Sequence, residues 1–135
     1  MKKLISAKYS AGAVNAAMLL LRLGFGILMM NHGYDKLIHF SEYKDQFINF
    51  LGLGKTFSLA LVVFAEFFCS LFLILGLFTR LATIPIIITM CVVIFKINNG
   101  QVFAQHESPA LYVTGLLVLL IVGPGRISVD GMIGK

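Results

Sequence analysis

Two charged side chains lie inside stretches that are otherwise apolar. Arg22 interrupts the run 13–33, and Glu66 interrupts the run 56–78. A charge at the centre of a membrane helix costs about 2.5–3.5 kcal/mol on insertion scales, so such residues pair with each other or face water. We expect an intramembrane salt bridge between them, because an extended arginine can cover the one helical turn, about 5.4 Å, that separates their predicted depths. The pair either fixes the helix register or serves a functional role.

A second group of polar side chains is expected to form a rim at the outer mouth of the bundle. It comprises His32, Asp35, Lys36, Lys96, His106 and Glu107. Histidine can exchange protons near neutral pH, and a quinone head group at the membrane interface needs such a donor or acceptor. A quinone is therefore a candidate cofactor. The alternative is a rim of ordinary loop charges in solvent.

Other chemistries have weaker support. His32, His39 and His106 lack the close spacing of a preformed metal site, so the sequence predicts no bound metal. Cys69 and Cys91 lie at comparable depth in adjacent apolar runs, where they are either small packing residues or a redox pair. No glycine-rich phosphate loop, nucleophile elbow or haem-attachment motif occurs in the sequence.

The composition indicates where these side chains must lie. Of 135 residues, 59% are hydrophobic and only 13% are charged, whereas soluble domains average about 45–50% apolar and about 25% charged residues. The net charge of +5 comes from lysines and arginines beside apolar runs, which is typical of membrane flanks and argues against nucleic-acid binding. The sequence predicts one integral membrane domain.

The elements that must position the charges follow from the apolar pattern. An all-α four-helix transmembrane bundle is expected, because each apolar run approaches the length that crosses about 30 Å of hydrocarbon. Aromatic and charged residues alternate at helical spacing between the first two spans, which predicts an amphipathic helix in the membrane interface. The spans are expected at 13–33, 56–78, 81–96 and 109–123, and the interfacial helix at 40–51.

Lysine and arginine counts suggest an orientation. Six lie on the side of the termini and four on the other: Lys2, Lys3, Lys8, Arg80, Arg126 and Lys135 against Lys36, Lys44, Lys55 and Lys96. This bias predicts both termini in the cytoplasm. The basic lead-in lacks an A-x-A cleavage site, so the first apolar run is expected to be a retained span rather than a signal peptide.

One face of the helix predicted for the first span combines two charged residues with glycines. Its members lie at i, i+4, i+7, i+11 and i+14, and they are Arg22, Gly26, Met29, Gly33 and Lys36. The glycines on this face allow another helix to approach closely. The run LLLRLGFGILMMNHGYDKL, the run FAEFFCSLFLILGLFTRLA and the closing GPGRISVD together resemble the DoxX family of small bacterial four-helix membrane proteins, from about Ala17 to Asp130. The residues that carry the resemblance are Arg22, Gly26, Gly33, Lys36, Glu66, Gly76, Arg80 and Arg126.

The resemblance implies a protein of the bacterial cytoplasmic membrane, related to the small subunit of a thiosulfate:quinone oxidoreductase. Three functions remain open. They are a membrane subunit of a quinone-linked redox system, a non-catalytic membrane anchor or assembly module for a partner protein, and a small-solute transporter. The last is disfavoured, because four short spans enclose little cavity and no inverted repeat is evident. Separately, we expect the chain to associate with a partner protein or to form a homo-oligomer.

Overall fold

The computed structural model describes residues 4–45, 52–103 and 107–134, and its secondary structure in these ranges is helical. A first long helix, α1, is capped at its start by Ser10, whose hydroxyl oxygen accepts a hydrogen bond from the Ala13 amide at 3.1 Å. The helices are α1 (Ala11–Ile38), α2 (Phe40–Tyr43), α3 (Lys55–Val63), η2 (Phe64–Cys69), α4 (Ser70–Leu75), α5 (Thr79–Val92), η3 (Val93–Ile97), α6 (Glu107–Val122) and α7 (Val129–Ile133). The segments η2 and η3 are π-helical turns that continue their neighbours without a break.

Three continuous helices are long and apolar enough to cross a membrane. They are Ala11–Ile38, Lys55–Leu75 and Thr79–Ile97. The apolar helix α6 has 16 residues, or about 24 Å at 1.5 Å per residue, which is less than the hydrocarbon thickness of about 30 Å. The chain is thus an all-helical membrane protein with at least three helices of spanning length in the described ranges.

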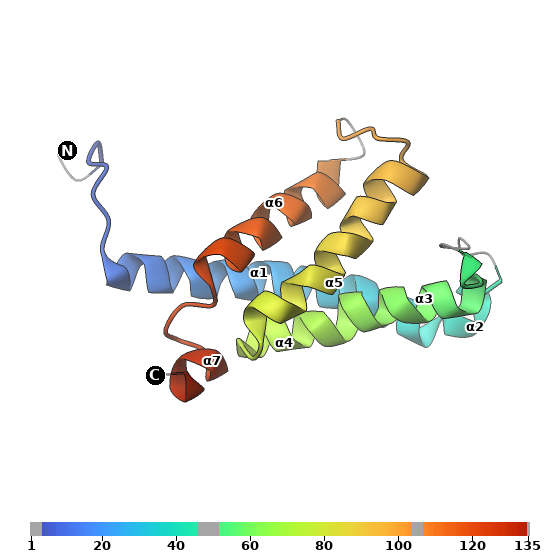
Figure 1. The fold of residues 1–135 in the computed structure, drawn as a ribbon, viewed down its shortest axis with the longest axis horizontal. Coiled ribbons are helices and arrows are strands. Elements are labelled where there is room, and N and C mark those ends of the chain that lie inside the picture. Colours follow the sequence, from blue (N-terminus) through green and yellow to red (C-terminus); the bar gives the residue numbers. More distant parts are fainter. Residues whose placement is uncertain (1–3, 46–51, 104–106, 135) are drawn as a thin grey trace.

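Successive long helices run antiparallel and form two pairs (Figure 1). α1 lies beside the α3–α4 helix, α5 lies beside α6, and the second pair tilts away from the first. We call the end where α1 finishes and α6 begins the rim end. The opposite end, where α4 turns into α5 and where residues 123–133 lie, is the tail end.

Glycines allow the first pair to pack closely. A Cβ atom at Gly33 would lie 2.5 Å from the Phe67 amide nitrogen and 2.6 Å from the Glu66 carbonyl carbon. At Gly26 it would lie 3.2 Å from the Ser70 carbonyl oxygen. At Gly33 a side chain would overlap the backbone of Glu66 and Phe67, and at Gly26 it would press on the Ser70 carbonyl and the Ile74 side chain, so glycine gives the closest packing at both points.

The core lies where the two pairs meet, and methionine and leucine side chains dominate it. As the spacing predicts, α1 buries Arg22, Gly26, Met29 and Gly33 on one face. The buried apolar cluster comprises Met18, Met29, Ala65, Cys69, Leu73, Ala82, Ile86, Met90, Leu116 and Leu119.

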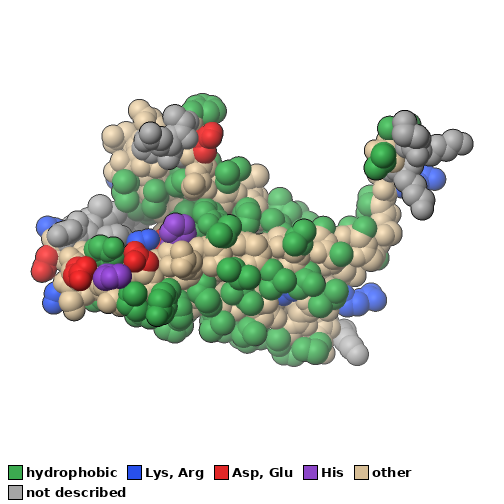
Figure 2. Space-filling view, turned by 180° about the vertical axis from the view of Figure 1, so that it is seen from behind, with side chains coloured by type: hydrophobic (Ala, Val, Ile, Leu, Met, Phe, Trp, Pro, Cys, Tyr) green, Lys and Arg blue, Asp and Glu red, His purple; other side chains and the backbone are tan. Residues whose placement is uncertain are grey.

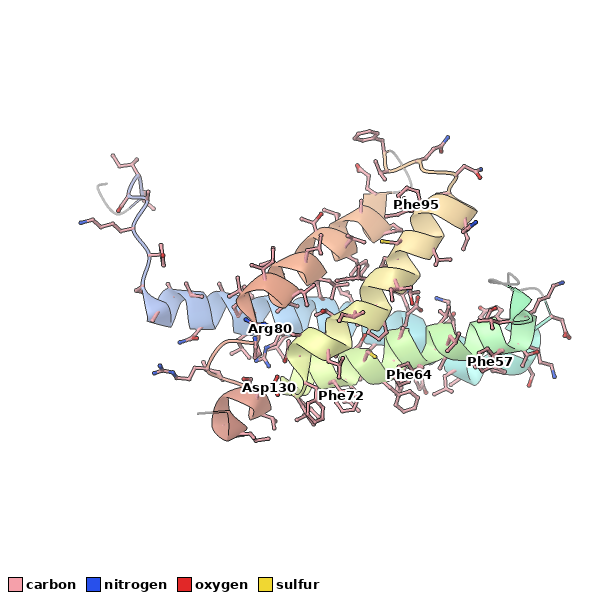
Figure 3. The ribbon with its side chains drawn as sticks, viewed as in Figure 1. Phe57, Phe64, Phe72, Arg80, Phe95 and Asp130 are labelled. Atoms are coloured by element: carbon pink, nitrogen blue, oxygen red, sulfur yellow. The ribbon has the colours of Figure 1, made fainter. Side chains whose placement is uncertain are left out.

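The outer surface is also apolar. Figure 2 shows hydrophobic side chains over much of the length of the bundle, with histidine and acidic side chains gathered at the rim end. Phe57, Phe64 and Phe72 project from successive parts of the α3–α4 helix (Figure 3), and the first two are about half exposed. A surface of this kind is buried by lipid, which explains why so many large apolar residues face outwards.

The helix boundaries differ from the sequence-based ones at the rim end. α1 continues to Ile38, five residues beyond the predicted end of the first span. The predicted interfacial helix over 40–51 is not confirmed: α2 is a single turn that ends at Tyr43, Lys44 and Asp45 form a turn, and 46–51 lie outside the described residues.

Candidate functional site

Glu66 forms a buried ion pair with Lys36, not with Arg22. The Lys36 Nζ donates to Glu66 Oε1 at 2.5 Å. The lysine side chain is 26% exposed and the glutamate side chain only 4%, so the charges meet at the edge of the interior. Our prediction of an Arg22–Glu66 salt bridge is wrong.

The error lies in the register of the two antiparallel helices. Gly33 packs against Glu66, and Arg22 packs against Gly76, at the far end of α4. Arg22 precedes Gly33 by eleven residues, which is about 16 Å along α1 at 1.5 Å per residue. The prediction measured the depths of Arg22 and Glu66 from the ends of their helices, which assumes that α1 and α4 end at the same level. At the tail end, α1 extends well past α4.

The ion pair lines a cavity of about 380 Å³ between α3, η2, α5 and η3. The other described residues in its walls are almost all apolar, with Ser58 and Thr89 as the further polar ones. Leu61 and Ile88, which also line it, are 40% and 52% exposed. The cavity therefore opens sideways, between the splayed helices, toward the membrane.

Two π-helical turns shape this cavity, since η2 carries Glu66 and η3 supplies Val93 and Ile97. A π-helical turn adds a residue to the helix and re-aims the side chains around it, and such turns are frequent at functional sites. Pro85 of α5 lines the cavity as well. No pattern in the sequence predicted the π-helical turns.

A smaller cavity of about 180 Å³ touches the same ion pair from the other side. It is lined by Lys36 and Glu66 together with His32, Ser108 and Tyr112. The His32 and Tyr112 rings meet edge to face, with 6.4 Å between centroids. Of the predicted polar rim, the structure thus brings His32 and Lys36 to one place and joins Glu66 to them.

The remaining members of the predicted rim lie elsewhere. Asp35 accepts a hydrogen bond from the Tyr43 hydroxyl at 3.3 Å and contacts His39 at 3.2 Å. The Asp35 carbonyl, hydrogen-bonded to the ring, raises the pKa of His39, with smaller contributions from the nearby carboxylates. Lys96 and Glu107 are exposed and line neither cavity, and His106 is outside the described residues.

Arg22 occupies the tail end, where it is 1% exposed. Its Nη2 donates to the Ile127 carbonyl at 2.5 Å, and the Asp130 carboxylate interacts with it electrostatically. Gly76, with φ of +72°, leaves the space that the guanidinium fills. Arg22 therefore ties α1 to the C-terminal segment.

Asp130 caps α5 from a distant part of the chain. Its two carboxylate oxygens accept hydrogen bonds from the Phe78 and Thr79 amides at 2.8 and 2.9 Å, and its own amide donates to the Gly76 carbonyl at 2.8 Å. Burial by itself raises the pKa of Asp130, but the hydrogen bonds from Thr79 and Phe78, together with the charge of Arg22, outweigh it and lower the pKa. The charged carboxylate is thus the form that the fold favours.

The other arginines of the sequence pattern also belong to the tail end. Arg80 Nη2 lies 3.3 and 3.2 Å from the Ile121 and Val122 carbonyls, which end α6. The Arg126 amide donates to Asn15 Oδ1 at 2.9 Å. Figure 3 shows Arg80 and Asp130 at this end of the bundle, far from Phe95 on η3.

Sequence reasoning missed functional or structural residues at both the rim end and the tail end. Tyr112 sits in an unbroken apolar run, so nothing set it apart. Asp130 belongs to the GPGRISVD motif, but its capping partner lies 51 residues away. The pairing of Lys36 with Glu66 had a usable signal in the sequence. Lys36 lies on the same face of α1 as Gly33, and Gly33 marks the closest approach of α1 to Glu66. Cys69 and Cys91 are both free thiols.

Comparison with known proteins agrees that the chain is a membrane protein. The DoxX family model matches residues 17–99. An uncharacterized membrane protein of Mycobacterium tuberculosis is 27% identical over 131 residues, covering 85% of this chain and 80% of the relative. No solved structure matches the chain. The family match covers more than half of the sequence and includes Arg22, Glu66 and Lys36, and the chain therefore belongs to the DoxX family.

Proposed function

We propose that the chain is a quinone-binding membrane subunit of a redox system, with Lys36 and Glu66 as the residues that hold the quinone head group. One observation carries the proposal: a buried ion pair lies on the wall of an apolar cavity that opens toward lipid. An isolated buried pair contributes little to stability, so its place beside free space favours a binding role.

The residues present fit a quinone. The cavity of about 380 Å³ falls within the usual range of about 300–1,000 Å³ for small-molecule sites. The Lys36 ammonium can donate a hydrogen bond to a quinone carbonyl oxygen, and the Glu66 carboxylate can accept one from a hydroquinone hydroxyl. The apolar walls suit a ring and its hydrocarbon tail. When bound, the quinone would supply electron and proton exchange, while the chain binds and orients it.

The wider setting follows from the family resemblance and the charge bias. A quinone-linked subunit needs a partner that supplies or takes electrons, as in the thiosulfate:quinone oxidoreductase whose small subunit this chain resembles. We place both termini in the cytoplasm and the rim end outside, from the six-to-four distribution of lysine and arginine. In this arrangement α6 is a fourth, short span.

Binding can be measured by tryptophan fluorescence, because the chain has no tryptophan of its own. Phe64→Trp places a reporter on the larger cavity. A decyl-ubiquinone titration of the purified chain in nanodiscs should quench it in a saturable manner. Ile121→Trp is the matched control: Ile121 is 75% exposed on α6 and lines neither cavity, so it reports only quinone dissolved in lipid.

The Lys36–Glu66 ion pair should determine the affinity of the chain for quinone. Glu66→Gln and Lys36→Met, each in the Phe64→Trp background, should weaken binding at least about tenfold, equivalent to about 1.4 kcal/mol. Lys96→Met changes an exposed lysine outside both cavities and should leave binding unchanged. Equal, unsaturable quenching of the cavity reporter and the lipid-facing control reporter would refute the proposal.

A further inference from the structure

The smaller cavity gives the buried ion pair a second access. Both cavities include Lys36 and Glu66 in their walls, so the pair stands between a lipid-facing space and a space toward the rim end. In the smaller cavity, His32 and Ser108 are exposed, and Ser108 lies in the first turn of α6. This cavity therefore reaches the surface of the bundle at the rim end.

The smaller cavity also has the polar lining that water requires. At about 180 Å³ it has room for several water molecules, since one needs only about 10–15 Å³ of such volume and two to four polar partners. His32, Ser108 and Tyr112 supply polar groups beside the ion pair. The larger cavity is far more apolar and faces hydrocarbon.

We propose that the smaller cavity is the route by which protons pass between water at the rim end and Glu66, with His32 as the relay. This deepens the proposed function, on which it rests for its purpose, because it assigns the side of the membrane from which the quinone site exchanges protons. His32 lies four residues before Lys36 on α1, so both side chains share one face of the helix.

The proton step is balanced without any electron transfer. A hydronium ion at the rim protonates the His32 imidazole and becomes water. The imidazolium passes the proton through water in the cavity to the Glu66 carboxylate, which leaves a neutral imidazole and a carboxylic acid. The reverse path returns the proton.

In the part of the chain that the structure describes, few titratable groups face Glu66 across the smaller cavity. Lys36 and His32 come from α1, and Tyr112 comes from α6. From α5 and η3 the described lining residues are Met90 and Val93, which do not titrate. Among the described residues that line this cavity, His32 is the imidazole, the kind of side chain that commonly relays protons.

Time-resolved infrared spectroscopy tests the route without any quinone. The full chain in nanodiscs receives protons from a photolysed caged acid, and the carboxyl band that Glu66→Gln removes is followed. His32→Ala should slow protonation of Glu66 about tenfold or more without changing its final extent. Imidazole in the buffer should restore the rate, which a merely structural role of His32 would not allow.

Two further variants complete the experiment. His39→Ala, which changes a histidine near the same end that lines neither cavity, should react at the wild-type rate. Ser108→Trp should slow the reaction by filling the cavity mouth. Equal rates in the His32 and His39 variants, or a Glu66 band that does not respond to protons, would overturn the route. This experiment contains no quinone, so its outcome does not depend on quinone binding. The proton route and the quinone site can therefore be refuted separately.

Discussion

The two ends of the bundle each hold a buried charge, but its surroundings differ. At the tail end Arg22 is enclosed by Gly76 and by the segment that carries Ile127 and Asp130. At the rim end Lys36 and Glu66 stand between two cavities. This difference indicates that a buried charge within an apolar bundle does not by itself mark a binding site. Lys36 and Glu66 themselves line two cavities, whereas the cavity of about 360 Å³ at the tail end is lined by Arg80 and Asp130 and not by Arg22.

The largest expected effect comes from Gly33, on which the rim-end geometry depends. Gly33→Ala places a methyl group against the backbone of Glu66 and Phe67, so α1 and η2 must separate. We expect a loss of about 3 kcal/mol in unfolding free energy and loss of quinone binding. Gly24→Ala is the control, because a Cβ there meets nothing within 4 Å. Denaturant unfolding in mixed micelles measures both, and similar stability of the two variants would contradict the close packing.

A smaller effect is expected at the tail end. Arg22→Met keeps most of the buried volume but removes the hydrogen bond to the Ile127 carbonyl and the attraction to Asp130. The unfolding free energy should fall by about 1–2 kcal/mol, while the quinone affinity of the folded protein stays at the wild-type value. A large loss of affinity at unchanged stability would place Arg22 in the site and remove the contrast between the ends.

The smallest effect concerns the cap on α5. Because hydrogen bonds lower the pKa of Asp130 in the folded protein, its stabilising contribution is present above the unfolded pKa of about 3.9 and is lost as pH falls through the folded value. Asp130→Ala should therefore cost about 1 kcal/mol at neutral pH, and the gap to wild type should narrow below about pH 4. Thermal unfolding between neutral and acidic pH measures this. A gap independent of pH would show that the carboxylate charge is not what stabilises the cap.

Some of this contrast was accessible from the sequence. The apolar runs predicted the long helices, and the glycine spacing predicted the face of α1 that turns inward. The glycine face made Lys36 a candidate partner for Glu66, but the sequence alone did not select it over Arg22, because the register depends on backbone contacts at Gly26 and Gly33. Asp130 likewise acts on residues 51 and 52 positions away. Long-range contacts of this kind decide which charged residues meet. The local spacing of residues in the sequence predicts only that these residues are buried.

The most direct test of the contrast replaces the rim-end pair with apolar residues of similar size. The double variant Lys36→Met, Glu66→Leu should be as stable as the wild type or up to about 2 kcal/mol more stable, because replacing both partners of a buried ion pair removes their desolvation cost. With the Phe64→Trp reporter added, it should no longer bind quinone in the fluorescence titration. Retained saturable binding, or a loss of more than about 2 kcal/mol in unfolding free energy, would show that the pair is a structural link like Arg22 and would contradict this account.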